Sequence, residues 1–210
     1  KEAMERDHKK LGPQLDLFMF DETAQGMPYW LPRGWKLYQT LLAYSRKLQE
    51  KHGYTEISAP LINKKKLWVI SGHWAHYQNN MFMVPGLTGF LAADAEIPGV
   101  LDNPADGLDE TATVKLEKGA PVFNRDLDDT MGAKPMNCPN AMMTYKRTLH
   151  SYKELPIRYS EYDVLHRKEK SGQMNGLFRV QEFRQDDDHT FVMESQIKEE
   201  IADVIAIADE

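Results

Sequence analysis

The sequence predicts an α+β fold, with short strands joined by tight turns and helices lying between them. Apolar residues recur at helical spacing in several separated segments. Runs rich in β-branched and aromatic residues, bounded by Gly, Pro or Asn, alternate with these helical segments. This order favours α+β over a parallel doubly wound sheet.

The N-terminal half begins with a predicted charged helix over residues 1–12, which Gly12-Pro13 should end. Two strands around residues 17–20 and 27–31 follow, and a long helix over residues 33–52 ends before Gly53. The next apolar run is interrupted by Pro60, so an edge or interface strand is expected there.

The C-terminal half resumes after an acidic segment at residues 86–131, which we interpret as an insertion. A helix is predicted to start near Pro139, and strands are predicted at about 156–165 and 178–193. A last helix at about 196–208 should bury its apolar residues, namely Ile197, Ile201, Val204 and Ile205.

Composition describes a folded, soluble chain of 210 residues, 41% of them hydrophobic, with no apolar run of the ~18 residues that a membrane helix needs. The net charge is −6, but residues 86–131 hold ten acidic and three basic residues, so the remainder carries about +1 and contact with a polyanion stays possible. The single cysteine, Cys138, excludes an intrachain disulfide and fits a reducing, cytoplasmic compartment.

The predicted strand at 178–193 has an unusual face. Alternate residues of a strand share a face, and here they are polar or aromatic: Arg179, Gln181, Phe183, Gln185, Asp187 and His189. From Arg179 to Asp187 the chain would rise ~26 Å, the scale of a nucleotide plus an amino acid. A solvent-exposed face on an edge strand is the alternative interpretation.

The loop before this strand favours a ligand. Arg167 suits bidentate pairing with phosphate oxygens, and Glu169 can accept a hydrogen bond from an adenine amino group. Phe183 could stack on a base, and Arg179 could contact a polyphosphate.

Arg167-x-Glu169 followed by Arg179-x-x-x-Phe183-x-x-x-Asp187 resembles motif 2 of the class II aminoacyl-tRNA synthetases. Four further segments resemble the threonyl family: Lys134–Pro139, Gln185–His189, Arg6–Gly12 and Ser71–Trp74. The resemblance covers residues 1–85 and 132–210. It implies a class II antiparallel sheet flanked by helices, with residues 1–210 forming part of a catalytic domain. Pro60 matches the motif 1 proline and implies a homodimer through that region.

The resemblance also implies a zinc site. Cys138 and His189 would be two of three protein ligands to a Zn²⁺ that binds the amino and hydroxyl groups of threonine, and the third ligand is missing from this sequence. Their spacing of 51 residues alone suggests an ordinary thiol and histidine. A helix start at Cys138, however, favours the thiolate that zinc requires.

The implied reaction is attack of the threonine carboxylate on the α-phosphate of ATP, then transfer of the threonyl group to tRNA(Thr). The expected ATP-binding residues are Arg167, Glu169, Arg179 and Phe183, with Arg167 as the catalytic residue and Mg²⁺ on the phosphates. Met136, Gln185 and Asp187 would bind threonine, with Asp187 accepting from its hydroxyl.

The sequence ends before a motif 3, so at most residual activity is expected of these 210 residues alone. The first alternative is a noncatalytic synthetase-like module that binds amino acid or ATP or only dimerises. The second is a seryl or prolyl relative, against which the pair of Cys138 and His189 argues.

Overall fold

The computed structural model describes residues 5–84, 90–91, 97–98, 113–114, 122–123, 130–170 and 172–210. The chain divides into two compact units. The first comprises residues 1–60, 136–165 and 174–210, and the second comprises residues 61–135 and 166–173.

The first unit is built on a three-stranded sheet with the order β14-β11-β3. Strand β11 (Ile157–Glu161) pairs antiparallel with β14 (Asp187–Phe191) and parallel with β3 (Thr55–Ile57). Strand β3 therefore lies at an edge, as the proline after it predicted. Next along the chain, β12 (Val164–His166) pairs with β13 (Glu182–Arg184).

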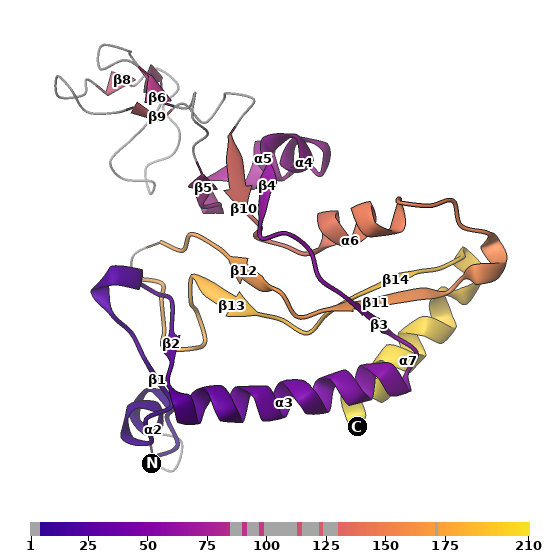
Figure 1. The fold of residues 1–210 in the computed structure, drawn as a ribbon, viewed down its shortest axis with the longest axis horizontal. Coiled ribbons are helices and arrows are strands. Elements are labelled where there is room, and N and C mark those ends of the chain that lie inside the picture. Colours follow the sequence, from indigo (N-terminus) through magenta and orange to yellow (C-terminus); the bar gives the residue numbers. More distant parts are fainter. Residues whose placement is uncertain are drawn as a thin grey trace. The chain divides into compact units, whose positions relative to one another are not determined.

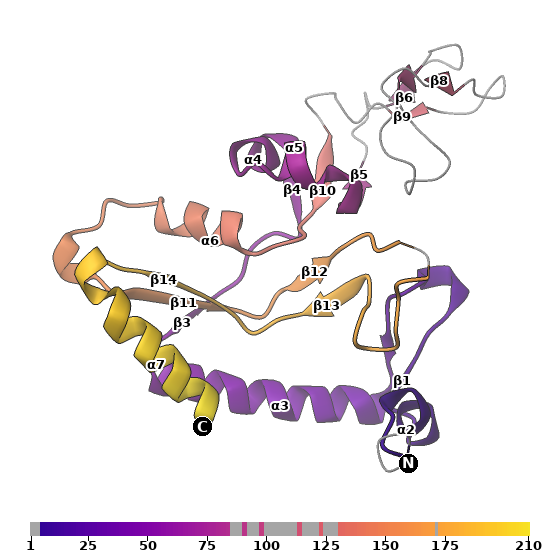
Figure 2. The ribbon, with the colours of Figure 1, turned by 180° about the vertical axis from the view of Figure 1, so that it is seen from behind.

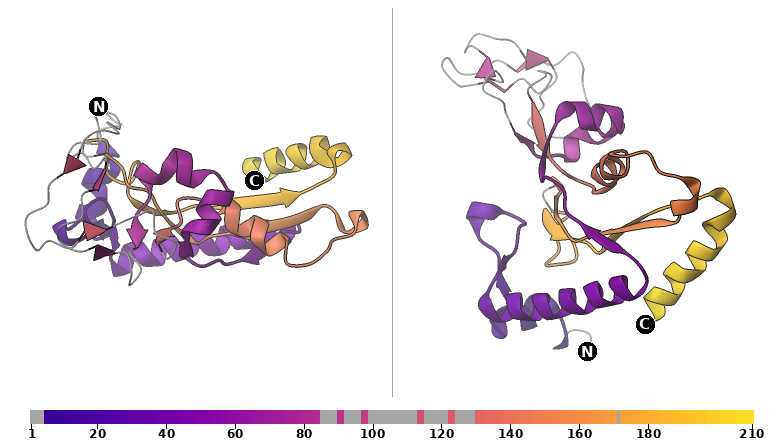
Figure 3. Two further views of the ribbon diagram at one scale, coloured as in Figure 1. Left: turned by 90° about the horizontal axis from the view of Figure 1, so that it is seen from above. Right: turned by 45° about the vertical axis from the view of Figure 1, so that its right-hand side comes forward.

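Helices cover both sides of this sheet. Figures 1 and 2 show α6 (Cys138–Tyr145) on one side and α3 (Pro32–Lys51) with α7 (Ile197–Asp209) on the other. Helix α3 starts with Pro32, whose ring fixes a helical φ where no N–H is needed. Figure 3 shows α7 running from the end of β14 to Glu210, whose carboxylate pairs with Lys51 at 2.6 Å.

Short elements precede α3. Helix α2 (His8–Gln14) leads into β1 (Phe18–Met19), which pairs antiparallel with β2 (Tyr29–Trp30). Short 3₁₀ helices complete the unit: η1 (Glu22–Ala24), η3 (Tyr152–Glu154) and η4 (Glu194–Gln196).

The prediction that Gly12-Pro13 ends the first helix is wrong, because α2 contains both residues. The Asp7 carboxylate caps the helix by accepting from the Lys9 N–H, and the Leu15 N–H bonds to the Leu11 carbonyl beyond the proline. Gly12 serves packing instead, since a Cβ there would lie 2.2 Å from the Phe18 ring.

The prediction that α7 buries its apolar residues is also wrong. Ile197, Ile201, Val204 and Ile205 are all exposed, and the buried residue of the helix is Glu200. The Glu200 carboxylate accepts two hydrogen bonds from the guanidinium of Arg158 on β11. An ion pair, rather than the apolar stripe, therefore fixes α7 to the sheet.

The second unit contains the sheet β4-β10-β5, formed by β4 (Ile62–Lys64), β10 (Met131–Ala133) and β5 (Met83–Val84). Helices α4 (Lys65–Ile70) and α5 (His73–Tyr77) and the 3₁₀ helix η2 (Gln78–Asn80) lie between β4 and β5 in the chain. Trp68, Trp74 and Met81 form the core of this unit.

Most of the predicted insertion at 86–131 lies outside the described residues. Its described part includes two antiparallel strand pairs: β6 (Phe90–Leu91) with β9 (Val122–Phe123), and β7 (Ile97–Pro98) with β8 (Thr113–Val114). Among the helices in the described ranges, none is long and apolar enough to cross a membrane.

Candidate functional site

One face of β14 is directed at α6. The Nδ2 of Asn137, the N-cap residue of α6, donates to Oδ2 of Asp187 at 3.1 Å. At the other end of the strand, Tyr145 stacks on Phe191 with ring centroids 4.0 Å apart. Successive strand residues alternate between faces, so His189 also belongs to this face. We call the set Asp187, His189 and Phe191 the α6 face.

The opposite face of β14 is directed at α3 and the residues after it. Nε2 of Gln49 donates to Asp188 at 2.7 Å and to Asp186 at 3.2 Å. Burial, and after it the neighbouring Asp186 carboxylate, raise the pKa of Asp188 to about 6. We call the set Asp186, Asp188 and Thr190 the α3 face.

Strand β11 adds polar groups to the α6 face. In the antiparallel register Glu161 lies opposite Asp187, and Tyr159 lies opposite His189. Glu161 is fully buried. Two carboxyl groups therefore lie next to each other at this end of the face.

Cys138 and His189 are the predicted zinc ligands. Cys138 opens α6 immediately after Asn137, and His189 lies two residues beyond the Asp187 that Asn137 contacts. Among the described residues, the buried Nδ1 atom of His189 has no hydrogen-bond partner, so it is available to bind a ligand. No group of three or more His, Cys, Asp or Glu in metal-binding geometry occurs among the described residues. The described residues therefore do not form a complete metal site, and zinc binding by Cys138 and His189 stays a prediction.

The predicted continuous strand over 178–193 is wrong. It is divided into β13 and β14, with Gln185 and Asp186 between them, and Arg179 lies before β13. The paired segment is also interrupted, at Tyr162 and Asp163 between β11 and β12. At these breaks, the Asp186 and Asp163 side chains accept hydrogen bonds from groups outside the β11–β14 and β12–β13 strand pairs.

The contacts at the two breaks give the physical reason. Ser45 and Gln49 of α3 donate to Asp186, and Asp163 accepts from Ser58 Oγ and the Ala59 N–H. Phe183 consequently lies on a different strand pair from Asp187 and His189, and Gln185 lies in the connection. Met136, half-buried, directly precedes Asn137.

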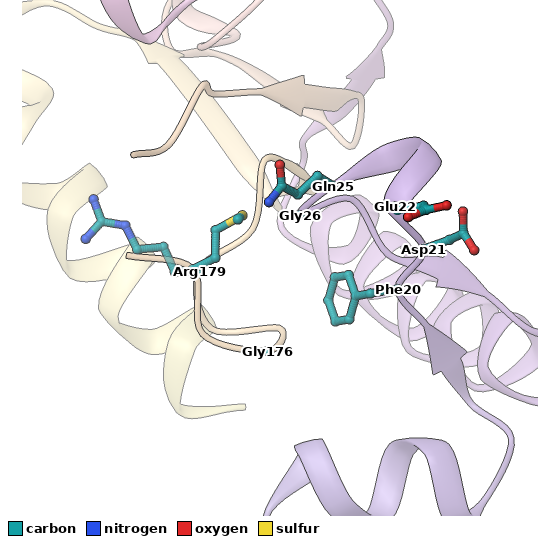
Figure 4. A pocket seen from close by; sticks show the side chains of 8 residues that line it. Phe20, Asp21, Glu22, Gln25, Gly26, Gly176 and Arg179 are labelled. Carbon is teal, nitrogen blue, oxygen red and sulfur yellow. The ribbon is translucent and has the colours of Figure 1, made fainter. Parts of the chain in front are cut away.

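Arg179 lines a cavity of about 380 Å³ (Figure 4). Its lining comes from the segment around β1 and η1 and from the loop before β13: Phe20, Asp21, Glu22, Gln25, Gly26, Met174, Gly176 and Arg179. The cavity is amphipathic, with an aromatic ring, two carboxylates and one guanidinium. No local sequence pattern indicated that residues 20–26 contribute to this cavity.

Arg167 and Glu169 belong to the second unit. Nε of Arg167 donates to the Pro135 carbonyl at 3.0 Å, and the Lys168 N–H bonds to the Asn80 carbonyl at 2.8 Å. Asn80 returns a side-chain hydrogen bond to the Lys168 carbonyl at 3.2 Å. These contacts fix the backbone from which Arg167 and Glu169 project.

Asn137 is a candidate site residue that no sequence pattern singled out. Its side chain is fully buried and makes no capping bond to α6, although Asn is a favoured N-cap residue. The amide instead orients a carboxylate of β14. The available signal was its place between Met136 and Cys138, both of which were predicted site residues.

The chain is similar to known aminoacyl-tRNA synthetases in sequence and in fold. Residues 121–210 match the family described as tRNA synthetase class II core domain (G, H, P, S and T). The whole chain is 40% identical to Threonine--tRNA ligase 2 of Bacillus subtilis over 211 residues and 41% identical to the threonine–tRNA ligase of Petrotoga mobilis. The chain is a relative of the threonine–tRNA ligases. It spans 27% of the length of each of these two relatives.

Solved structures agree with this relationship. One is a structure titled as the RNA binding domain of threonyl-tRNA synthetase from Cryptosporidium parvum. The alignment covers 96% of this chain and 40% of that chain, with 34% identity and a TM-score of 0.74. Another is Giardia lamblia prolyl-tRNA synthetase in complex with prolyl-adenylate. The alignment covers 99% of this chain and 35% of that chain, with 15% identity and a TM-score of 0.71. The second likeness concerns the fold alone. The predicted α+β class II synthetase fold is confirmed.

Proposed function

We propose that this chain is part of the catalytic domain of a ligase that joins threonine to tRNA(Thr) through threonyl-adenylate. The observation that carries the proposal is the α6 face, where a buried amide holds Asp187 and a nitrogen of His189 has no partner within the described ranges. The whole-chain similarity to threonine–tRNA ligases supports the same substrate class.

Recognition of threonine follows from the polar groups of this face. Asp187, already oriented by Asn137, would accept from the threonine hydroxyl, and the carboxylates of Asp187 and Glu161 would favour the ammonium group. Valine lacks the hydroxyl and would leave Asp187 without that donor. A site built to bond a hydroxyl rejects such an analogue strongly, whereas an apolar pocket does so poorly. Met136 and Gln185 are proposed to line the threonine site.

Zinc is proposed to bind through Cys138 and His189. When bound, the metal would supply a Lewis-acidic contact to the amino and hydroxyl groups of threonine. Metal analysis of the purified chain should find less zinc in Cys138→Ser than in the parent chain. Equal zinc content in the two proteins would remove the ligand assignment.

The nucleotide is proposed to be ATP with Mg²⁺. Arg167 would stabilise the charge that develops on the α-phosphate as the threonine carboxylate attacks it. Glu169 and Phe183 would hold the adenine, and Arg179 would contact the γ-phosphate. None of these residues acts as a nucleophile, so positioning and electrostatic stabilisation would supply the rate.

The partners proposed for the whole protein are tRNA(Thr) and a second copy of the chain bound through the region near Pro60, in the cytoplasm. The acidic segment at 86–131 is proposed to be an insertion into this catalytic domain.

The decisive experiment titrates nonhydrolysable threonyl-, seryl- and valyl-adenylate analogues into the 210-residue chain by calorimetry. We expect the threonyl analogue to bind at least tenfold more tightly than the valyl analogue. Equal affinity for both would contradict the threonine site. Absence of heat with every analogue and with MgATP would favour a noncatalytic dimerisation module instead.

A further inference from the structure

The N-terminal helix α2 contacts the loop that carries Arg179. We call residues 174–179 the Arg179 loop. The N–H of Leu177 donates to Nε2 of His8 at 2.9 Å, and Nζ of Lys9 donates to Oδ1 of Asn175 at 3.1 Å. Two consecutive residues of α2 thus bond to the backbone and the side chains of one short loop.

Packing around His8 restricts the same loop further. The imidazole lies 4.5 Å from the Phe178 ring in an edge-on arrangement. Gly176 has a φ of +54°, and a Cβ there would lie 2.3 Å from Nε2 of His8 and 2.7 Å from Cγ of Lys9. Only glycine can adopt this backbone at such close approach, so the loop fits directly against α2.

Backbone hydrogen bonds also hold the base of the loop. Asn175 and Arg179 form an isolated antiparallel bridge, and the Asn175 N–H bonds to the Arg179 carbonyl at 3.1 Å. Two residues on, the Gln181 N–H bonds to the Gly26 carbonyl at 2.7 Å. The position of Arg179 at the cavity in Figure 4 is therefore set by contacts at the tip and at the end of the loop.

We propose that His8 is a positioning residue for Arg179. It acts as the hydrogen-bond acceptor that fixes the tip of the Arg179 loop, and so it sets the direction of the guanidinium toward a bound polyphosphate. The second part of this statement rests on the proposed ATP-binding role of Arg179. The first part concerns the chain alone and is tested without a ligand.

The acceptor role requires one particular state of the ring. An imidazole nitrogen accepts a hydrogen bond only when it carries no proton, so the neutral His8 ring must be protonated at Nδ1. Oδ1 of Asp7 lies 3.5 Å from Nδ1. An acidic neighbour at Nδ1 favours the tautomer that leaves Nε2 free to accept from Leu177.

Substitutions at His8 can separate the acceptor from the ring. His8→Phe keeps an aromatic ring against Phe178 and removes the acceptor. His8→Gln places Oε1 four bonds from Cα, as Nε2 is, whereas Oδ1 of His8→Asn is one bond closer and matches Nδ1. The glutamine variant is therefore the conservative replacement, and the asparagine variant is its matched control.

The first measurement is amide hydrogen exchange at Leu177 by NMR, with the β11 amides as an internal reference for intact folding. We expect about tenfold faster exchange at Leu177 in H8F and H8N, near-parent exchange in H8Q, and unchanged exchange in β11. Parent-like exchange at Leu177 in H8F and H8N would overturn the proposal. Equally fast exchange in all three variants would also overturn it, because ring packing rather than the acceptor would then hold the loop.

The second measurement is the affinity for MgATP by calorimetry in the parent chain, H8F, Arg179→Ala and the double variant. We expect about fivefold weaker binding in H8F and no further loss when H8F is added to R179A, because His8 acts through Arg179. Additive losses in the double variant would overturn the positioning role. No MgATP binding by the parent chain would count against the proposed function, while the exchange result would still decide the role of His8 in the loop.

Discussion

The two faces of β14 both carry carboxylates, but their surroundings differ. On the α6 face Asp187 accepts from the buried amide of Asn137. On the α3 face Asp186 and Asp188 share the one Nε2 of Gln49, and the pKa of Asp188 is raised to about 6. The α6 face holds one oriented carboxylate beside a histidine whose Nδ1 has no hydrogen-bond partner in the part of the chain that the structure describes. The carboxylates of the α3 face accept hydrogen bonds from helix α3 and hold it. The candidate ligand-binding groups and the groups that hold the helix thus lie on opposite faces of β14.

The largest expected effect that tests this separation is on ligand binding. Asp187→Asn should weaken binding of the threonyl-adenylate analogue about 100-fold, because the hydroxyl of threonine loses a charged acceptor. Asp188→Asn, one residue further on the opposite face, is the matched control and should leave that affinity unchanged. Calorimetry measures both, and equal losses in the two variants would contradict the assignment of the faces.

A second prediction concerns stability on the α3 side of the sheet. Arg158→Leu should lower the free energy of unfolding by about 2 kcal/mol, because Glu200 would remain mostly buried without its partner. Urea denaturation measures the change, with exposed Arg147→Leu as the control. Affinity for the threonyl analogue should not change. An R158L variant as stable as the control would show that this pair does not anchor α7.

The third prediction concerns the donor that the α3 face shares. Gln49→Leu keeps the side-chain volume but leaves Asp186 and Asp188 without the Nε2 donor, so we expect a loss of about 1.5 kcal/mol. Glu50→Leu, at the exposed neighbouring position of α3, should cost much less. Equal unfolding midpoints for the two variants would mean that the hydrogen bonds contribute no net stability.

The smallest expected effect is on the α6 face. Tyr145→Leu removes the ring stacked on Phe191 and should cost about 1 kcal/mol in unfolding free energy. Tyr152→Leu, at a largely exposed tyrosine, is the control. A loss larger than that of R158L would show that the α6 face is also a main source of stability, and would weaken the contrast between the faces.

Local sequence signals predicted several elements well. The long helix, expected at 33–52, is observed as α3 from Pro32 to Lys51, and Gly53 follows it with a φ of +79°. The last helix, expected at 196–208, is observed as α7 from Ile197 to Asp209. Helical periodicity and end signals act within one element, so they can be recognised before the fold is known.

Signals that depend on neighbours were less reliable. The alternation from Arg179 to His189 predicted one strand, but the hydrogen bonds from α3 to Asp186 accompany a break that no local pattern reveals. The apolar stripe of α7 predicted burial, yet the described part of the chain leaves it exposed and buries Glu200. Both outcomes depend on residues more than 40 positions away, Gln49 in one case and Arg158 in the other.

The amino-acid sequence by itself determined the α+β class, the class II resemblance and the residue types of the candidate site, because these follow from local periodicity and from motif spacing. Only the tertiary structure decided that the Asn137 side chain donates to Asp187 and does not cap α6, and that His8 accepts from the Leu177 N–H. The physical reason is that a side chain can bond to several partners. Which bond forms depends on the distant donors and acceptors that folding brings within about 3 Å.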